Sequence, residues 1–240
     1  MAETQVTIRG TTYALKEEHV KYESALETVA TALHEAEQLF ADPEFLEHGW
    51  KKVSETVDGD VVLSKNVPEG KMFLVSFVAE WSVDKCMYNA WTTLDTVFEW
   101  NETIDFAHTI ATLSDTVDIV TYGSNGMSVV SGRDFVSARI YKELPDDAYL
   151  IASRSVEIPE HPPLKGIVRA HLHMAAVRLR PDPAAPKDRT ICDIASSFDL
   201  KGYIPKFVIN QVMPRLMVQE AEQNKKHWKE LAEREKRGFA

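Results

Sequence analysis

The sequence predicts an α+β fold in which an antiparallel sheet packs against helices at one face or end. Three observations support this prediction: a helical pattern near the N-terminus, a central run of short strand-like segments, and a long helical pattern at the C-terminus. Elements in this order bury their apolar sides against each other as layers of one domain. We therefore expect residues 1–240 to form a single domain, with a core from about residue 15 to residue 236.

The first helix is expected from about Leu15 to Phe40, because apolar residues recur there at helical spacing and Pro43 follows. Strand-like runs come next, at Val61–Ser64 and Met72–Val78, and both lie beside turn residues. A second helical pattern covers Val83–Asn101, with apolar residues along one side.

After the second helix the pattern changes to strands as far as about Leu200. The expected strands are Phe106–Leu113, Val117–Tyr122, Asp134–Lys142, Tyr149–Val156, Ile167–Leu179 and Thr190–Phe198. Turn residues separate them, including the run Ser124-Asn125-Gly126. The last helix is expected at about Pro205–Lys236, and Pro214 should bend it because proline removes one backbone donor.

Composition limits the class of protein. Apolar residues make up 44% and charged residues 27% of the chain, which is typical of a soluble globular protein. The net charge of −10 argues against nucleic acid as a partner. From Gln223 to Ala240, six Lys and Arg face three Glu, and this local excess favours either an anionic membrane or a solvated helix end. With no membrane-spanning apolar run and no signal-peptide pattern, we expect a cytoplasmic protein.

Residues that often carry chemistry show no catalytic or metal-binding pattern. Cys86 and Cys192 lie far apart and are expected to be buried, reduced thiols. The G-x-S-x-G, Walker A and H-E-x-x-H motifs are absent from the sequence. His171 and His173 alternate on one expected strand, but no third metal ligand is evident. The sequence therefore predicts neither an enzyme nor a cofactor or metal site.

Several short motifs, in a fixed order, resemble the START domain, the lipid-transfer module related to the steroidogenic acute regulatory protein. These motifs are Gly49-Trp50-Lys51, Gly59-Asp60, Trp100-Asn101, Gly132–Val136, Lys165–Ala170 and Asp199–Pro205. The similarity runs from roughly Tyr22 to Leu231. It is greatest to the sterol-binding branch, notably in the strings RDFVSAR, KGIVRA and DLKGYIPK.

The resemblance implies a helix-grip fold, in which a curved antiparallel sheet wraps around the long C-terminal helix and leaves a tunnel for one lipid. The loop Gly123–Gly132 would act with that helix as a movable cover. Its apolar residues Met127, Val129 and Val130 would either dip into a bilayer or pack against the last helix. We therefore expect a monomer that carries a sterol or a similar apolar lipid and contacts membranes transiently.

The resemblance also places Arg139 in the tunnel, at its polar end. Strand alternation puts Ser137 on the same face as Arg139. In the sterol-binding branch the partner of this arginine is often an acid on the preceding strand, where this chain offers Tyr122; the nearest acid, Asp118, lies four residues earlier. We expect Arg139 and Tyr122 to meet the polar group of the ligand, while a carboxylate partner for Arg139 remains open.

Five further positions complete the expected site. Asn101 either satisfies a turn or lies near the tunnel, and His171 stands where the family commonly has an acid. Phe207, Met213 and Met217 either line the helix side of the tunnel or pack in an ordinary core. The alternatives are a phospholipid or carotenoid carrier, a helix-grip enzyme acting on an apolar ligand, and a sensor that does not transfer lipid.

Overall fold

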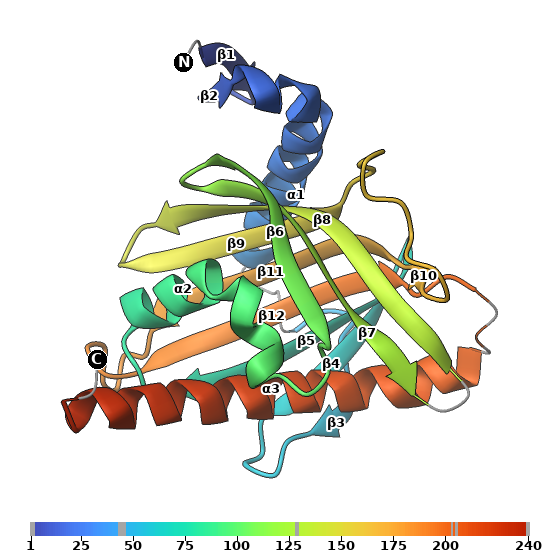
Figure 1. Cartoon of the computed structure of the whole chain (residues 1–240). Helices are drawn as coiled ribbons and strands as arrows, with labels where there is room; N and C mark the ends of the chain where they lie inside the picture. The colour runs from blue at the N-terminus through green and yellow to red at the C-terminus, as the bar shows by residue number, and fades with distance from the viewer. Residues whose placement is uncertain (1–2, 43–46, 128–129, 203, 205, 239–240) are drawn as a thin grey trace.

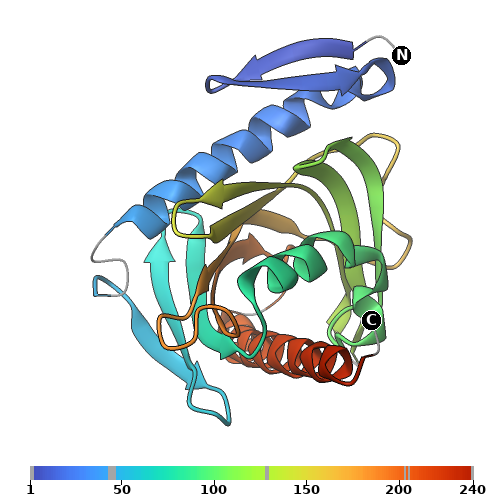
Figure 2. The same ribbon diagram turned by 90° about the vertical axis from the view of Figure 1, so that its left-hand side faces the viewer.

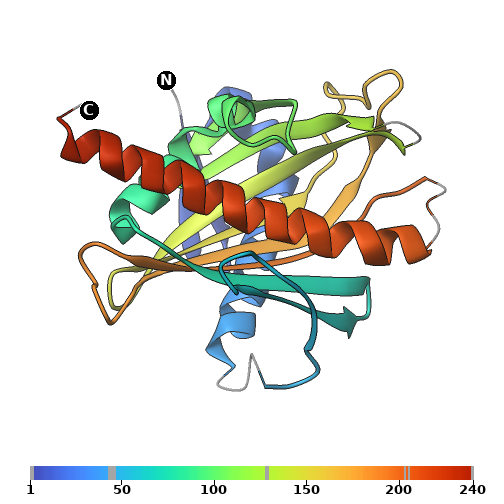
Figure 3. The same cartoon turned by 90° about the horizontal axis from the view of Figure 1, so that it is seen from below.

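A ten-stranded curved sheet forms the body of the protein, and the long C-terminal helix lies across its inner face (Figures 1 and 3). The computed structural model describes residues 3–42, 47–127, 130–202, 204 and 206–238, without the side chains of residues 127, 130 and 206–208. The sheet order is β3-β4-β5-β12-β11-β9-β8-β7-β6, with neighbours antiparallel, and β10 pairs in parallel with β8. This confirms the expected curved antiparallel sheet around a C-terminal helix.

The bounds of the elements follow the chain. They are β1 (Glu3–Ile8), β2 (Thr11–Lys16), the 3-10 helix η1 (Glu17–Tyr22), α1 (Glu23–Ala41), β3 (Lys51–Glu55), β4 (Val61–Val67), β5 (Gly70–Ala79), α2 (Val83–Thr92), the 3-10 helix η2 (Leu94–Glu99), β6 (Phe106–Ser114), β7 (Val117–Met127), β8 (Val130–Leu144), β9 (Ala148–Ser155), β10 (Val168–Arg169), β11 (His171–Pro181), β12 (Thr190–Asp199) and α3 (Lys206–Lys236).

The N-terminus differs from the sequence prediction. The expected helix begins at Glu23 and not at Leu15, because residues 3–16 form the hairpin β1–β2. Arg9 and Gly10, both with positive φ, form its two-residue turn, which is the backbone conformation that tight hairpins favour. Val6 and Leu15 of this hairpin are buried against the start of α1 and extend the apolar core there.

The predicted loop Gly123–Gly132 is also mostly strand. β7 continues to Met127 and β8 starts at Val130, so the pairing of Gly126 with Ser131 lies inside the hairpin. The turn expected at Ser124-Asn125-Gly126 was therefore placed too early along the chain. Strand β3 is a further element that the sequence reading missed, because its burial pattern is almost entirely exposed and carries no apolar alternation.

The sheet has two faces with different covers. α1 packs on the outer face over β8 and β9, while α3 crosses the inner face and packs against β5 (Figure 2). Alternate residues of each strand belong to one face or the other, because successive side chains in a strand point to opposite sides. On β8, for instance, Val136, Ala138 and Ile140 are buried in the outer core. The residues between them lie on the inner face.

Candidate functional site

The inner face carries a polar group of residues on the paired strands β7 and β8. Arg139 and Ser137 of β8 lie there, one position away from the buried outer-face residues Ala138 and Ile140. On β7, Asp118 pairs in register with Arg139. Both Arg139 and Asp118 are buried, so their charges must be satisfied within the protein.

The guanidinium of Arg139 is held from three directions. Its Nε lies 2.9 Å from Oδ1 of Asp118, and its Nη2 donates to Oδ2 of the same carboxylate and to the carbonyl of Trp91 at 3.2 Å. The ring of Trp91 covers the guanidinium at 4.5 Å and packs edge-on against Tyr141 at 4.8 Å. No described residue accepts a hydrogen bond from Nη1 of Arg139. This nitrogen of the guanidinium group is therefore available to donate to a ligand.

The partner of Arg139 is thus Asp118, the acid that sequence spacing left as an open question. The residue numbers of paired residues on β7 and β8 add up to a constant, from Met127 with Val130 at the tip to Asp118 with Arg139. The sequence prediction placed the turn about three residues too early, which changes this sum and pairs Arg139 with the wrong residue of β7. Only the exact position of the hairpin tip reveals the correct pair. Trp91, on α2, is a second member that the sequence reading missed.

Tyr122 lies next to this pair on the inner face. Its ring stacks on Phe135 with 5.3 Å between centroids. Burial raises the pKa of the Tyr122 hydroxyl to about 12, while Ser137 and Arg139 act in the opposite direction. The hydroxyl is therefore protonated at neutral pH. The hydroxyl of Ser137 is fully buried and lies close enough to Tyr122 to affect its pKa, but it makes no hydrogen bond of standard geometry with a described residue.

Apolar side chains surround these polar groups on the inner face. Phe135, Ala175, Val177, Ile194 and Phe198 all keep part of their surface accessible, although α3 lies over this face. Met213 and Met217 are buried on the α3 side, and the sulfur of Met217 lies 3.6 Å from the hydroxyl of Ser196. On the same strands, the outer-face neighbours Val136, Ala176 and Ala195 are, by contrast, almost completely buried.

Asn101 anchors the helix that covers the inner face. Its Oδ1 accepts from the backbone N–H of Thr103 at 3.0 Å, and its Nδ2 donates to Glu220 of α3 at 3.1 Å. Asn101 is buried with both ends of its amide used. The structure therefore supports the turn-satisfying reading of this residue and adds a tie to α3.

Several further contacts hold the C-terminal half of α3. Trp100 stacks on His227 with 4.1 Å between centroids, and Trp228 donates to Asn89 of α2 at 2.8 Å. Lys225 forms ion pairs with Asp58 and Asp60 at 2.7 Å each. Burial lowers the pKa of His227, so its ring is neutral in this contact near pH 7.

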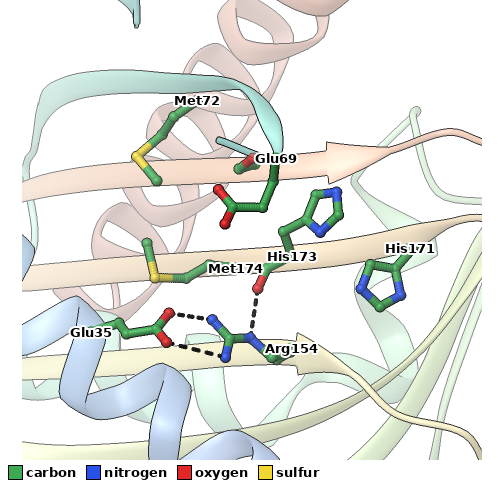
Figure 4. Close-up of a pocket in the computed structure, with 8 residues that line it drawn as sticks. Glu35, Glu69, Met72, Arg154, His171, His173 and Met174 are labelled. Carbon is green, nitrogen blue, oxygen red and sulfur yellow. Dashed lines mark hydrogen bonds and ion pairs between the residues drawn. The ribbon is translucent and has the colours of Figure 1, made fainter. Parts of the chain in front are cut away.

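His171 does not join the inner-face group. It lies in a pocket on the outer face with His173, Arg154 and Glu35 (Figure 4). The expectation that His171 contacts the tunnel is therefore corrected. Four other expected residues cannot be placed: the side chains of Met127, Val130 and Phe207, and all of Val129, lie outside the described residues.

The two cysteine side chains, Cys86 and Cys192, are buried free thiols. Burial raises the pKa of the Cys86 thiol to about 12 and that of Cys192 well above its ordinary value, so both thiols stay protonated. Among the described residues, no group of three or more His, Cys, Asp or Glu could hold a metal ion. No helix in the described part of the chain is long and apolar enough to cross a membrane.

Comparison with known proteins gives one consistent family. A START domain profile matches residues 30–234. The chain is 41% identical over 228 residues to steroidogenic acute regulatory-like protein 1 of Caenorhabditis elegans, which covers 94% of this chain and 87% of that protein. It is 31% identical over 175 residues to the mitochondrial steroidogenic acute regulatory protein of Ovis aries. That match covers 72% of this chain and 61% of the sheep protein.

A solved structure shares the fold. Human StAR-related lipid transfer protein 5 superimposes with a TM-score of 0.78 at 22% sequence identity, covering 88% of this chain and 99% of that one. At this identity the likeness concerns the fold alone. It agrees with the helix-grip arrangement of a curved antiparallel sheet around the C-terminal helix.

Proposed function

The chain belongs to the START domain family, and on that basis we propose that it is a lipid-transfer protein that carries one sterol or similar apolar lipid. The lipid would lie between the inner face of the sheet and α3. Its transport would be non-enzymatic, with transient contact at membranes. We also predict that the whole chain forms one such domain, acts as a monomer and resides in the cytoplasm.

The observation that carries this proposal is the accessible apolar lining of the inner face. Val177, Ile194 and Phe198 keep accessible surface beneath α3. Moving a lipid from a bilayer into water costs about 0.8 kcal/mol of free energy for each exposed CH₂, so moving a sterol body costs on the order of 10 kcal/mol. Apolar walls in place of acyl chains remove most of that barrier.

The polar groups favour a neutral hydroxyl over a charged head group. Asp118 already neutralises Arg139, and the remaining Nη1 donor suits an oxygen that accepts a single hydrogen bond. The hydroxyl groups of Tyr122 and Ser137 can donate or accept beside it. A phosphate would meet only one neutralised arginine here, so a sterol fits this position better than a phospholipid.

The alternatives make different demands. A helix-grip enzyme using His171 would need that side chain at the ligand, and it lies on the opposite face of the sheet. A carotenoid needs a longer apolar site with little polar recognition, and so would be insensitive to changes at Arg139. A phospholipid would be expected to gain affinity when Asp118 is made neutral.

The first experiment is native mass spectrometry of the purified full chain, with solvent extraction of whatever is bound. We expect one sterol or similar lipid per chain, both as purified and after incubation with sterol-containing liposomes. An empty chain that takes up no sterol, carotenoid or phospholipid from liposomes would contradict lipid transport.

A matched pair of variants then tests the head-group site. Arg139→Lys retains the charge but loses the planar fork, so it should weaken sterol binding about tenfold while barely affecting cholestane, which lacks the hydroxyl. The control is Arg178→Lys, because Arg178 pairs with Asp193 and lies over an aromatic ring at the same 4.5 Å, on the outer face. Equal effects of both variants on sterol binding would remove Arg139 from the site.

A further inference from the structure

A pocket of about 330 Å³ lies on the outer face of the sheet, beside α1 (Figure 4). Its lining residues are Glu35, Glu69, Met72, Arg154, His171, His173, Met174 and Ser197. Met72 and Met174 belong to the outer core, on the side away from α3. The pocket is therefore separated by the sheet from the proposed lipid site.

A β-bulge in β11 shapes this pocket. The pairing of β11 with β12 shifts between Leu172 and Met174. In a regular strand His171 and Met174 would point to opposite faces, because side chains alternate. The inserted residue brings both to the outer face, as bulges commonly do where they redirect a side chain. Imidazole groups and an apolar thioether thus share one wall.

The floor of the pocket contains an unsatisfied polar group. Ser197 is 2% exposed, and its Oγ has no hydrogen-bond partner among the described residues. Buried hydroxyl groups are nearly always hydrogen-bonded to protein or to ordered water, so this oxygen leaves a hydrogen-bonding position open at the floor of the pocket. Met72 and Met174 beside it are flexible, polarizable side chains that make favourable contacts with aromatic rings.

Of the charged groups that line the pocket, one carboxylate, that of Glu69, has no cationic partner among the described residues. Arg154 is fully engaged, since Nε donates to the carbonyl of His173 at 2.6 Å and both terminal nitrogens donate to Glu35. Glu69 forms no hydrogen bond or ion pair with a described residue. Burial and the neighbouring His173 lower the pKa of His171, so its ring carries no charge at neutral pH. The pocket is therefore negative overall.

From this arrangement we propose that the outer-face pocket binds a small organic cation, a protonated amine attached to an aromatic ring. The ammonium group would pair with Glu69, the ring would pack on Met72 and Met174, and a donor on the ring would bond to Ser197. The volume is at the small end of the range for small-molecule sites. An anion is disfavoured because Arg154 is already neutralised by Glu35.

The test uses tryptamine, whose ammonium group and indole N–H match Glu69 and Ser197. The full chain carries ¹³C-methyl methionine and is titrated up to about 10 mM amine while its methyl NMR signals are recorded. We expect saturable shifts at Met72 and Met174 and none at Met213 and Met217, which report on the α3 side. Tryptophol, which is neutral, and indole-3-propionate, which is anionic, should bind at least about tenfold more weakly.

Two variants assign the contacts. Glu69→Gln, in an exposed turn, should weaken tryptamine binding about tenfold, whereas the matched control Glu99→Gln on η2 should leave it unchanged. Ser197→Ala should weaken binding of tryptamine but not of phenethylamine, which lacks the indole N–H.

Three outcomes would overturn the proposal: no saturable shift with either amine, equal effects of the two glutamate variants, or shifts at Met213 and Met217 alone. Prior loading with sterol should not change the tryptamine affinity. The proposal for this pocket can therefore fail without the proposed lipid function failing, and the reverse.

Discussion

Two arginine–aspartate pairs lie on opposite faces of the same sheet and have nearly the same geometry. Arg139 pairs with Asp118 on the inner face, and Arg178 pairs with Asp193 on the outer face. Each guanidinium lies 4.5 Å from an aromatic ring, Trp91 inside and Phe40 outside. The difference is in what remains free around them.

The outer pair uses all of its groups. Nη1 of Arg178 donates to the carbonyl of Phe40 at 3.3 Å, and Asp193 also accepts from Ser76 at 2.7 Å and from Arg180 at 3.4 Å. The inner pair leaves Nη1 of Arg139 without a described partner. The outer pair is completed by the protein, and the inner pair leaves one donor without a partner among the described residues.

The apolar neighbours differ in the same way. Ala176 of β11 is completely buried under the outer layer, while the next residue, Val177, keeps accessible surface on the inner face. Both residues belong to one strand, and only the alternation of side chains separates them. Around this part of β11 the outer face is closely packed, whereas the inner face keeps apolar surface accessible.

The largest expected effect comes from breaking the inner pair. Arg139→Leu leaves the carboxylate of Asp118 buried and unpaired, which should lower the free energy of unfolding by about 3–5 kcal/mol in urea titrations. Adding Asp118→Leu should restore most of this loss. Arg178→Leu should cost less, because Arg180 and Ser76 still bind Asp193. A double variant no more stable than the single one would contradict the assignment.

Adjacent substitutions on β11 test the two faces directly. Ala176→Phe overpacks the filled outer core and should destabilise the protein by about 1–3 kcal/mol or more, yet leave lipid uptake intact. Val177→Phe should be tolerated by the empty protein but occupy space for the lipid. In the wild-type protein, a free lipid concentration of a hundred times Kd should raise the free energy of unfolding by about 2.7 kcal/mol. Val177→Phe should abolish this increase. Reversal of the two phenotypes in thermal unfolding would refute the comparison.

A smaller effect concerns the helix that covers the inner face. Asn101→Ala removes a buried hydrogen bond to Glu220, near the middle of α3, and should cost about 1–3 kcal/mol. In the N-terminal half, Lys71→Ala removes an exposed contact to Asn210 and should cost about 0.5 kcal/mol or less. Hydrogen exchange should then be faster in the N-terminal half of α3 in the wild-type protein. Uniform protection along the helix would contradict this asymmetry.

The smallest effect is a pH dependence from the contact between Trp100 and His227. Burial lowers the pKa of His227 from its ordinary value of 6.5, and the nearby Glu230 opposes this only in part. Below pH 6.5 the unfolded chain therefore binds the proton more readily, so stability should fall as the pH is lowered and not change above that value. His227→Gln should reduce this dependence, measured by urea titrations between pH 7.5 and 5.5, while His34→Gln on the exposed side of α1 serves as the control.

Sequence patterns alone were sufficient for most of the helices and strands after Glu23, although not for β1, β2 and β3, and for the shared face of Ser137 and Arg139. Helical spacing located α3, and strand alternation on β8 correctly placed Ser137 with Arg139, because both depend only on neighbours in the chain. The motifs that resemble START domains also indicated the correct family. Local periodicity does not depend on how distant segments meet, so it is readable without a structure.

Tertiary structure decided which residues meet. The pairing of Arg139 with Asp118 requires the exact hairpin register, which a turn misplaced by a few residues hides. The contact of Arg139 with Trp91 requires the docking of α2, which strand periodicity does not reveal. His171 was assigned to the wrong face because its surroundings depend on the pairing of β11 with its neighbours and on a bulge that local alternation does not reveal. The accessible inner face and the orphan hydroxyl of Ser197 likewise exist only once distant strands and helices pack. Contacts between residues far apart in sequence set burial, and burial determines which polar groups remain open to a ligand.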